Sequence, residues 1–313
     1  ALLASLLLAA LASGGLHRPT SNPNVLVVGL PNGPNNLDPR IGTDEASARC
    51  AQLVFSSLMT FDENFRVVPE LAERLENPDP TTYVVSLRRG VKFHDGHELT
   101  SADVVFTFRS LLDPKFISAK KGAYRAVKSI EARDRDTVVF TLKEPFGSFP
   151  VNLVMPIVPD GSPASFGKHP IGTGPYRFVD YVVDDHVDLV SFADYYGGRP
   201  RNDGIVLKIV PDDITRGLEL RKGTTDIVVN DLTPDIAYQL QQVDRLLMVA
   251  SPGVDYQYLG LNLRDPILRD VRVRQALAYA IDTHAIIEFL RRGLAAPAAG
   301  LLPKQSWAAA PDV

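Results

Sequence analysis

The segment 83–106 constrains the fold more than any other, because signals for a strand, a tight turn and a helix follow one another directly. Tyr83–Leu87 is rich in β-branched residues, which is typical of a buried strand. Asp95-Gly96 predicts a tight turn. Thr100-Ser101-Ala102-Asp103 then forms a capping box that starts a helix. The segment therefore predicts a protein of mixed α/β class.

The rest of the chain continues this α/β pattern without a regular βαβ repeat. Helices are expected after capping residues at Asp44, Thr100, Asp213 and Asp270, and they should end near Met59, Leu112, Lys222 and Gly293. Strands are expected where apolar residues alternate or run together, at Val25–Leu30, Tyr83–Leu87, Thr137–Leu142, Val187–Phe192, Ile205–Val210, Asp226–Val229, Leu246–Ala250 and Tyr256–Leu263.

Composition narrows the classes of function. The 313 residues are enough for two domains. The net charge is -4 with both signs mixed along the chain, so we expect no nucleic-acid partner, which would require concentrated Lys and Arg. The single cysteine, Cys50, excludes an internal disulfide and a CxxC zinc site. We expect Cys50 to be a buried and inert thiol.

The first residues predict export. Ala1–Ala12 is an uncharged apolar run, shorter than the roughly 20 residues that span a bilayer. Ala10-Leu11-Ala12 has the small-x-small pattern of a signal-peptidase site, and glycines follow where a lipoprotein would have cysteine. A buried apolar helix is the alternative. We expect a signal peptide and flexible lead over 1–23, and a periplasmic or otherwise extracytoplasmic protein.

Recognisable catalytic motifs are missing from the sequence. It has no GxSxG elbow and no Walker A loop, and Gly172-Thr173-Gly174 lacks the third glycine of a dinucleotide loop. His94, His97 and Glu98 lie close together, but their segment predicts a turn between a strand and a helix. Asp184-Asp185-His186 resembles a catalytic set only in composition, and a solvated strand start explains it better. We therefore expect a binding protein with no catalytic residue, no metal and no cofactor.

Five segments occur in an order that carries a family resemblance. They are Leu37-Asp38-Pro39, the segment 83–106, Pro170–Tyr176 with its Pro-x-Gly-Thr-Gly-Pro-Tyr pattern, Gly223–Asn230 ending in DIVVN, and Asp270–Asp282 with DVRVRQALAYAID. Together they resemble the family 5 extracellular solute-binding proteins, which include the dipeptide, oligopeptide and nickel receptors of ABC importers. The resemblance covers about 25–307.

The resemblance implies a two-lobed α/β fold of the type II periplasmic-binding-protein kind, with an extra subdomain in the first lobe. By analogy, 24–43 and 166–255 form the central subdomain, 44–165 the inserted one, and 256–313 the start of the second lobe. Family members continue well past the region that matches Pro303–Trp307, so the second lobe is expected to be incomplete here. The implied protein is a monomer that closes on a ligand and delivers it to permease subunits of an ABC importer.

The resemblance also implies a peptide site. In the oligopeptide receptors, backbone groups near the end of the chain's first crossing form hydrogen bonds with an extended peptide, as an added β-strand would. The positions that match these backbone groups are Gly42, Thr43 and Asp44. The resemblance also places Asn230, Tyr256 and Tyr258 at the cleft, with Tyr124 as a weaker candidate. The acidic partner of the peptide amino terminus should lie beyond Val313.

Each candidate has a structural alternative. Gly42 could serve a turn, Asp44 a helix cap and Asn230 a strand end, while a tyrosine is more often a core residue.

Two further alternatives concern the ligand and the class of protein. The same fold could bind a nickel chelate, haem or an oligosaccharide, and a secreted hydrolase is the third possibility.

Overall fold

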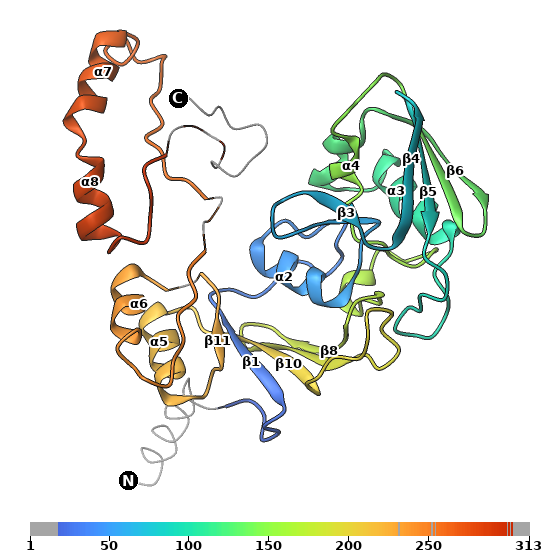
Figure 1. The fold of residues 1–313 in the computed structure, drawn as a ribbon, viewed down its shortest axis with the longest axis horizontal. Coiled ribbons are helices and arrows are strands. Elements are labelled where there is room, and N and C mark those ends of the chain that lie inside the picture. Colours follow the sequence, from blue (N-terminus) through green and yellow to red (C-terminus); the bar gives the residue numbers. More distant parts are fainter. Residues whose placement is uncertain are drawn as a thin grey trace, which may run out of the picture. The chain divides into compact units, whose positions relative to one another are not determined.

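The computed structural model describes residues 18–230, 232–251, 253, 255–298, 300 and 302 (Figure 1). The expected signal peptide at Ala1–Ala12 lies outside these residues. The chain divides into two units, Ala1–Asp231 and Leu232–Val313, and each is described by itself. In the described parts, no helix combines the length and the apolar character needed to cross a membrane.

A five-stranded sheet in the order β11-β1-β10-β9-β8 forms one layer of the first unit. β1 (Val25–Leu30) lies between β10 (Gly204–Ile209) and β11 (Ile227–Val228) and runs parallel to both. β9 (His186–Ser191) and β8 (Tyr176–Val182) continue the sheet antiparallel. All six residues of β10 are buried, as its apolar sequence predicts for a central strand.

α2 (Glu45–Val54) packs on this sheet and begins after its predicted cap, Asp44. It ends earlier than predicted because Phe55 has extended backbone, with φ -121° and ψ 168°. The chain then enters a short hairpin of β2 (Met59–Phe61) and β3 (Val67–Pro69). The core between α2 and the sheet gathers buried apolar residues, among them Leu30, Cys50, Val54, Val187 and Leu207.

A second, four-stranded antiparallel sheet has the order β4-β5-β7-β6. Its strands are β4 (Ala72–Asp79), β5 (Thr82–Leu87), β7 (Thr137–Leu142) and β6 (Val127–Asp134). α3 (Ser101–Leu112) lies on this sheet, and both hydrogen bonds of the predicted capping box are formed. The core beneath α3 combines many aliphatic side chains with a group of aromatic ones that includes Phe93, Phe108, Phe140 and Phe149.

Shorter helices complete the first unit. η1 (Ala119–Tyr124) is a 3-10 helix after α3, α4 (Phe149–Asn152) follows β7, and η2 (Phe166–Lys168) precedes β8. α5 (Asp213–Lys222) is capped by Asp212, one residue before the predicted cap. Glu219 of α5 makes a buried ion pair with Lys208 of β10, with 2.6 Å between Oε1 and Nζ, which anchors the helix to the sheet.

The second unit corrects two strand predictions. Leu246–Ala250 and the described residues of Tyr256–Leu263 are not strands. Their side chains are mostly exposed, as at Leu247 (87%) and Tyr258 (76%). The described residues contain no strand that pairs with them, and a strand depends on such pairing for its backbone hydrogen bonds.

The helix predicted from Asp270 to Gly293 is also wrong in its length. α7 (Val271–Ala280) starts at its predicted cap, Asp270, but ends before Ile281, whose backbone is extended. Asp282 then caps a new short helix, α8 (Thr283–Ala285), by accepting a hydrogen bond from Ala285 N. A π-helical turn, η3 (Ile286–Leu290), follows, and α6 (Pro234–Leu240) stands earlier in the unit.

Candidate functional site

The loop between β1 and α2 carries three of the predicted site residues. Asp44 Oδ1 accepts a hydrogen bond from Ser47 N (2.9 Å), and Oδ2 accepts from Ser47 Oγ (2.6 Å) and Asn35 N (3.2 Å). Burial alone would raise the pKa of Asp44, but these hydrogen bonds outweigh it and hold the pKa below its usual value. The Asp44 side chain therefore caps α2, which leaves mainly the backbone groups of Asp44 for a ligand.

Gly42 and Thr43 have different surroundings. Gly42 is buried and donates its N–H to Asp38 O (2.9 Å), and a Cβ there would lie 2.5 Å from Asn36 O. Gly42 is thus required for close packing of the loop. Thr43 is exposed, and its Oγ1 accepts from Asn35 Nδ2 at 3.3 Å. Of the three residues, Thr43 presents most of its surface to solvent.

Asn230 lies at the same edge of the five-stranded sheet. It follows β11, which is parallel to β1, so the carboxyl ends of both strands face this edge. Asn230 is exposed and has a left-handed backbone, with φ of 61°. Arg49 of α2 joins the two regions by donating to Val229 O (2.7 Å) and to Glu45 Oε1 (2.6 Å). The structure therefore brings the start of α2 and the end of β11 together.

The predicted aromatic residues fall into two groups. Tyr256 and Tyr258 belong to the second unit, where their exposed rings pack on each other with centroids 5.4 Å apart. Tyr124 belongs to the first unit and is 3% exposed. Its hydroxyl donates to Asn152 O (3.0 Å), and burial raises its pKa. Tyr124 is therefore a core residue, which is the role expected for it if it does not contact a ligand.

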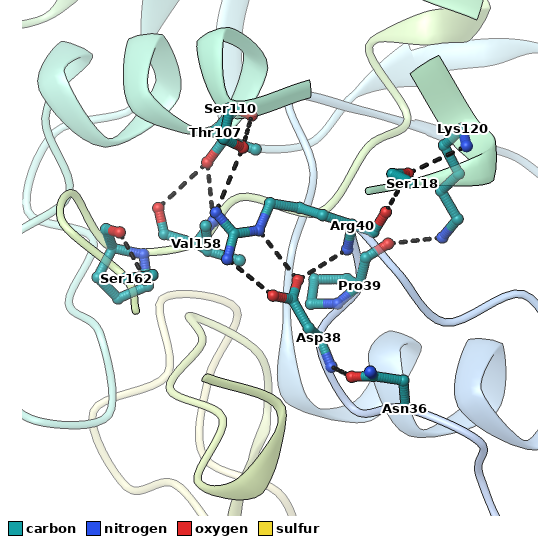
Figure 2. Close-up of polar contacts among 11 residues, drawn as sticks. Asn36, Asp38, Pro39, Arg40, Thr107, Ser110, Ser118, Lys120, Val158 and Ser162 are labelled. Atoms are coloured by element: carbon teal, nitrogen blue, oxygen red, sulfur yellow. Dashed lines mark hydrogen bonds and ion pairs between the residues drawn. The ribbon is translucent and has the colours of Figure 1, made fainter. Parts of the chain in front are cut away.

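Sequence reasoning missed a buried ion pair that holds the β1–α2 loop in place (Figure 2). Arg40 and Asp38 are each 1% exposed, and two hydrogen bonds join them, from Nη2 to Oδ2 (2.7 Å) and from Nε to Oδ1 (3.0 Å). Burial removes the hydration of both charges, and only good geometry and further hydrogen bonds offset that cost. The Asp-Pro-Arg sequence was the available signal, but burial is not visible in it.

This pair also reaches the layer that contains α3. Arg40 Nη1 donates to Ser110 Oγ (3.3 Å), and the guanidinium carbon lies 4.9 Å from the ring centre of Phe116. Ser118 Oγ donates to Arg40 O (2.6 Å), so the loop, α3 and the start of η1 form one connected group (Figure 2). The pair thus fixes the position of the loop that carries Gly42–Asp44.

His94 connects the turn at Asp95-Gly96 to the Pro170–Tyr176 loop. Its Nδ1 accepts from Gly172 N (3.2 Å), and its Nε2 lies 3.0 Å from Gly174 O, so the hydrogen-bond pattern assigns the proton to Nε2. Burial lowers the pKa of His94, and the bond to Gly174 O offsets part of that shift. His94 is thus a structural residue held in its neutral form.

The two remaining titratable clusters are explained by local structure. His97 Nδ1 lies 2.6 Å from Asp95 Oδ1 across the predicted turn, where Gly96 has φ of 94°. His186 opens β9, as expected for a strand start. Within the described residues, no group of three or more His, Cys, Asp or Glu side chains is placed to hold a metal ion. Cys50 is a free cysteine and is buried, as predicted, and burial raises the pKa of its thiol to about 12, which disfavours the reactive thiolate.

Comparison with known proteins gives consistent matches. A glutathione-binding protein of Pectobacterium atrosepticum is 35% identical over 277 residues, which cover 86% of this chain and 54% of that protein. Heme-binding protein A of Haemophilus influenzae is 31% identical over 320 residues, covering 92% of this chain and 58% of that protein.

A solved structure agrees with these matches. The oligopeptide-binding protein AppA of Bacillus subtilis, in complex with a nonapeptide, superposes with a TM-score of 0.83 and 30% identity over 92% of this chain and 60% of that chain. The predicted α/β fold of the type II periplasmic-binding-protein kind is thereby confirmed. The chain spans little more than half the length of these three proteins.

The family itself is identified by a model that covers most of the chain. The model of the bacterial extracellular solute-binding proteins, family 5, middle region, matches residues 66–313. This chain therefore belongs to the family 5 bacterial extracellular solute-binding proteins.

Proposed function

We propose that this chain is part of an extracytoplasmic receptor that captures peptides for an ABC importer. The observation that carries the proposal is the similarity of its fold to an oligopeptide-binding protein in complex with a nonapeptide, with a TM-score of 0.83. The glutathione-binding relative supports the same class of ligand, since it is 35% identical. Family membership supports a binding role without catalysis.

In this proposal, an extended peptide lies along the edge where the β1–α2 loop meets the end of β11. The backbone of Gly42, Thr43 and Asp44 pairs with the peptide as an added strand would. The exposed Asn230 amide contributes a further hydrogen bond. Tyr256 and Tyr258, which are exposed in the second unit, stay proposed ligand residues on the ground of the family resemblance alone. Closure of two lobes about a hinge then buries the ligand.

The proposal includes location and partners. The receptor is exported by a signal peptide within 1–23, acts as a monomer outside the cytoplasm and delivers its ligand to permease subunits in the membrane. The domain division also belongs to the proposal, with 24–43 and 166–255 as the central subdomain, 44–165 as the inserted one and 256–313 as the start of the second lobe.

Haem is the second candidate ligand, because the Haemophilus influenzae relative is a heme-binding protein at 31% identity. Native mass spectrometry of the protein purified from its own host distinguishes the two ligands. We expect a heterogeneous set of peptide masses and no Soret absorbance. A stoichiometric haem with its Soret band would contradict the peptide proposal, and cleavage of added peptides by the purified protein would favour a hydrolase.

A further inference from the structure

A hollow of about 380 Å³ opens between η1 and the segment that begins in α4. Its floor is buried, with Tyr124 3% and Met155 6% exposed, whereas Val151 at its rim is 46% exposed. Small-ligand sites typically have volumes of roughly 300–1,000 Å³. The hollow is therefore large enough for one amino-acid side chain, and part of its apolar lining faces water.

Lys120 is the one charged side chain among the residues that line this hollow. The two other polar lining residues are already engaged, since Tyr124 OH donates to Asn152 O (3.0 Å) and Asn152 Nδ2 donates to Ala123 O (2.7 Å). Lys120 Nζ donates to Pro39 O at 2.5 Å, and an ammonium group has three N–H donors. The lysine is thus the polar lining group best able to meet a ligand.

Burial shapes the chemistry of this amine. Loss of water lowers the pKa of Lys120, and the nearby Asp38 carboxylate offsets part of that shift. A carboxylate that enters the apolar hollow stabilises a partly dehydrated ammonium by ion pairing, because solvent screens such a pair little. The remaining lining atoms favour methylene groups over charged ones.

Lys120, one of the lining residues, connects the hollow to the loop of the proposed peptide site through its hydrogen bond to Pro39 (Figure 2). Pro39, which accepts the Lys120 hydrogen bond, precedes Thr43 by four residues in the sequence. Consecutive Cα atoms are 3.8 Å apart, so Thr43 lies within about 15 Å of Pro39. An extended peptide rises about 3.3 Å per residue, so about five residues span the distance from Thr43 to Pro39, the residue that Lys120 contacts.

We propose that this hollow is a side-chain subsite of the peptide site, selecting a residue with an aliphatic stem and a carboxylate tip, such as glutamate. The inference rests on the proposed peptide-binding function. The stem packs against Ala123, Val151 and Met155, and the carboxylate pairs with Lys120. A lysine side chain entering the same hollow would be repelled by the Lys120 ammonium.

A random pentapeptide pool, incubated with the native protein and recovered by gel filtration, tests the subsite. Mass spectrometric sequencing of the retained fraction should show glutamate enriched at one position, about tenfold over lysine, the value of one charge-assisted hydrogen bond. Ala123→Leu should abolish the enrichment by filling the hollow, because Ala123 is an exposed lining residue. Ala102→Leu is the matched control, since Ala102 is exposed on α3 and does not line the hollow.

Lys120→Met tests the charge of the side chain separately from its shape, because methionine is similar in length to lysine but is uncharged. It should replace the glutamate preference by a preference for leucine or methionine, while circular dichroism reports an unchanged fold. Retained peptides without acidic enrichment, or enrichment that survives both Ala123→Leu and Lys120→Met, would overturn the subsite and leave the receptor function standing. Retention of no peptide at all would overturn both.

Discussion

Asn230 combines a backbone role with a proposed ligand contact, and substitution can separate the two. Its φ of 61° lies in the left-handed region, which glycine adopts freely and alanine adopts only with strain. We predict that Asn230→Gly leaves the free energy of unfolding nearly unchanged, whereas Asn230→Ala lowers it by about 1 kcal/mol. Both should weaken peptide binding by up to about tenfold through the lost amide hydrogen bond. Chemical denaturation and calorimetric titration measure the two effects, and full affinity in Asn230→Gly would remove Asn230 from the site.

His94 predicts a dependence of stability on pH. Its folded-state pKa is lowered from 6.5, chiefly by burial, so the unfolded state binds the proton more readily. The free energy of unfolding should therefore fall as the pH drops below about 6.5, and the loss should continue down to the folded-state pKa. Protonation of Nδ1 would also break the hydrogen bond from Gly172 N.

Glutamine at this position can keep one donor and one acceptor without titrating. Urea denaturation between pH 7.5 and 5 should show a shallower loss of stability for His94→Gln than for the wild type. His97→Gln serves as the control, because His97 lies on the surface beside Asp95. An equal pH slope in the wild type and His94→Gln would show that His94 does not carry this dependence.

At the scale of elements, the Pro170–Tyr176 loop illustrates how close packing selects glycine. A Cβ on Gly172 would collide with Val54 O at the end of α2, and one on Gly174 would lie 2.6 Å from Val54 C. We predict that Gly172→Ala lowers the free energy of unfolding by about 2–3 kcal/mol through overpacking. Gly147→Ala is the control, since nothing lies within 4 Å of a Cβ there. Thermal unfolding that shifts equally in both variants would contradict this packing role.

Strands and helices with complete local signals could be predicted from the sequence. β1 and β7 occupy the predicted residues, and α3 begins at its capping box. β4 and β6 were missed because most of their residues are polar and exposed, so the two-residue alternation of a half-buried strand is weak. β8 is rich in aromatic and β-branched residues, but a register shift between Phe178 and Asp180 interrupts its alternation of partly buried and exposed residues. Tertiary pairing, which the local sequence does not encode, makes these segments strands.

The candidate site was predictable to a similar extent. The family resemblance named Thr43 and Asn230 as candidate ligand residues, and the structure brings both to one edge of the sheet, while their contact with a ligand stays a prediction. It could not separate them from Gly42 and the Asp44 side chain, whose surroundings show packing and capping roles. The Asp38–Arg40 pair was missed because burial and partner geometry depend on the whole fold.

At the scale of the whole molecule, the two units differ in how they bury their side chains. The first unit contains both apolar cores. The described residues of the second unit include none that is buried, and α7 exposes Val271 (51%), Leu277 (36%) and Tyr279 (91%). An amphipathic helix draws most of its stability from burying its apolar face. Within the part of the chain that the structure describes, α7 therefore lacks that source of stability.

Hydrogen exchange should show this difference directly. In the 313-residue chain, we predict that amides of α7 exchange at least about a hundredfold faster than amides of α3, whose capped helix lies on a buried core. α3 serves as the internal control, because both helices are measured in one sample by mass spectrometry. In a longer form of the protein that supplies apolar partners, the amides of α7 should gain protection while those of α3 stay unchanged. Protection of α7 equal to that of α3 in the 313-residue chain would show that the second unit is stabilised without such partners.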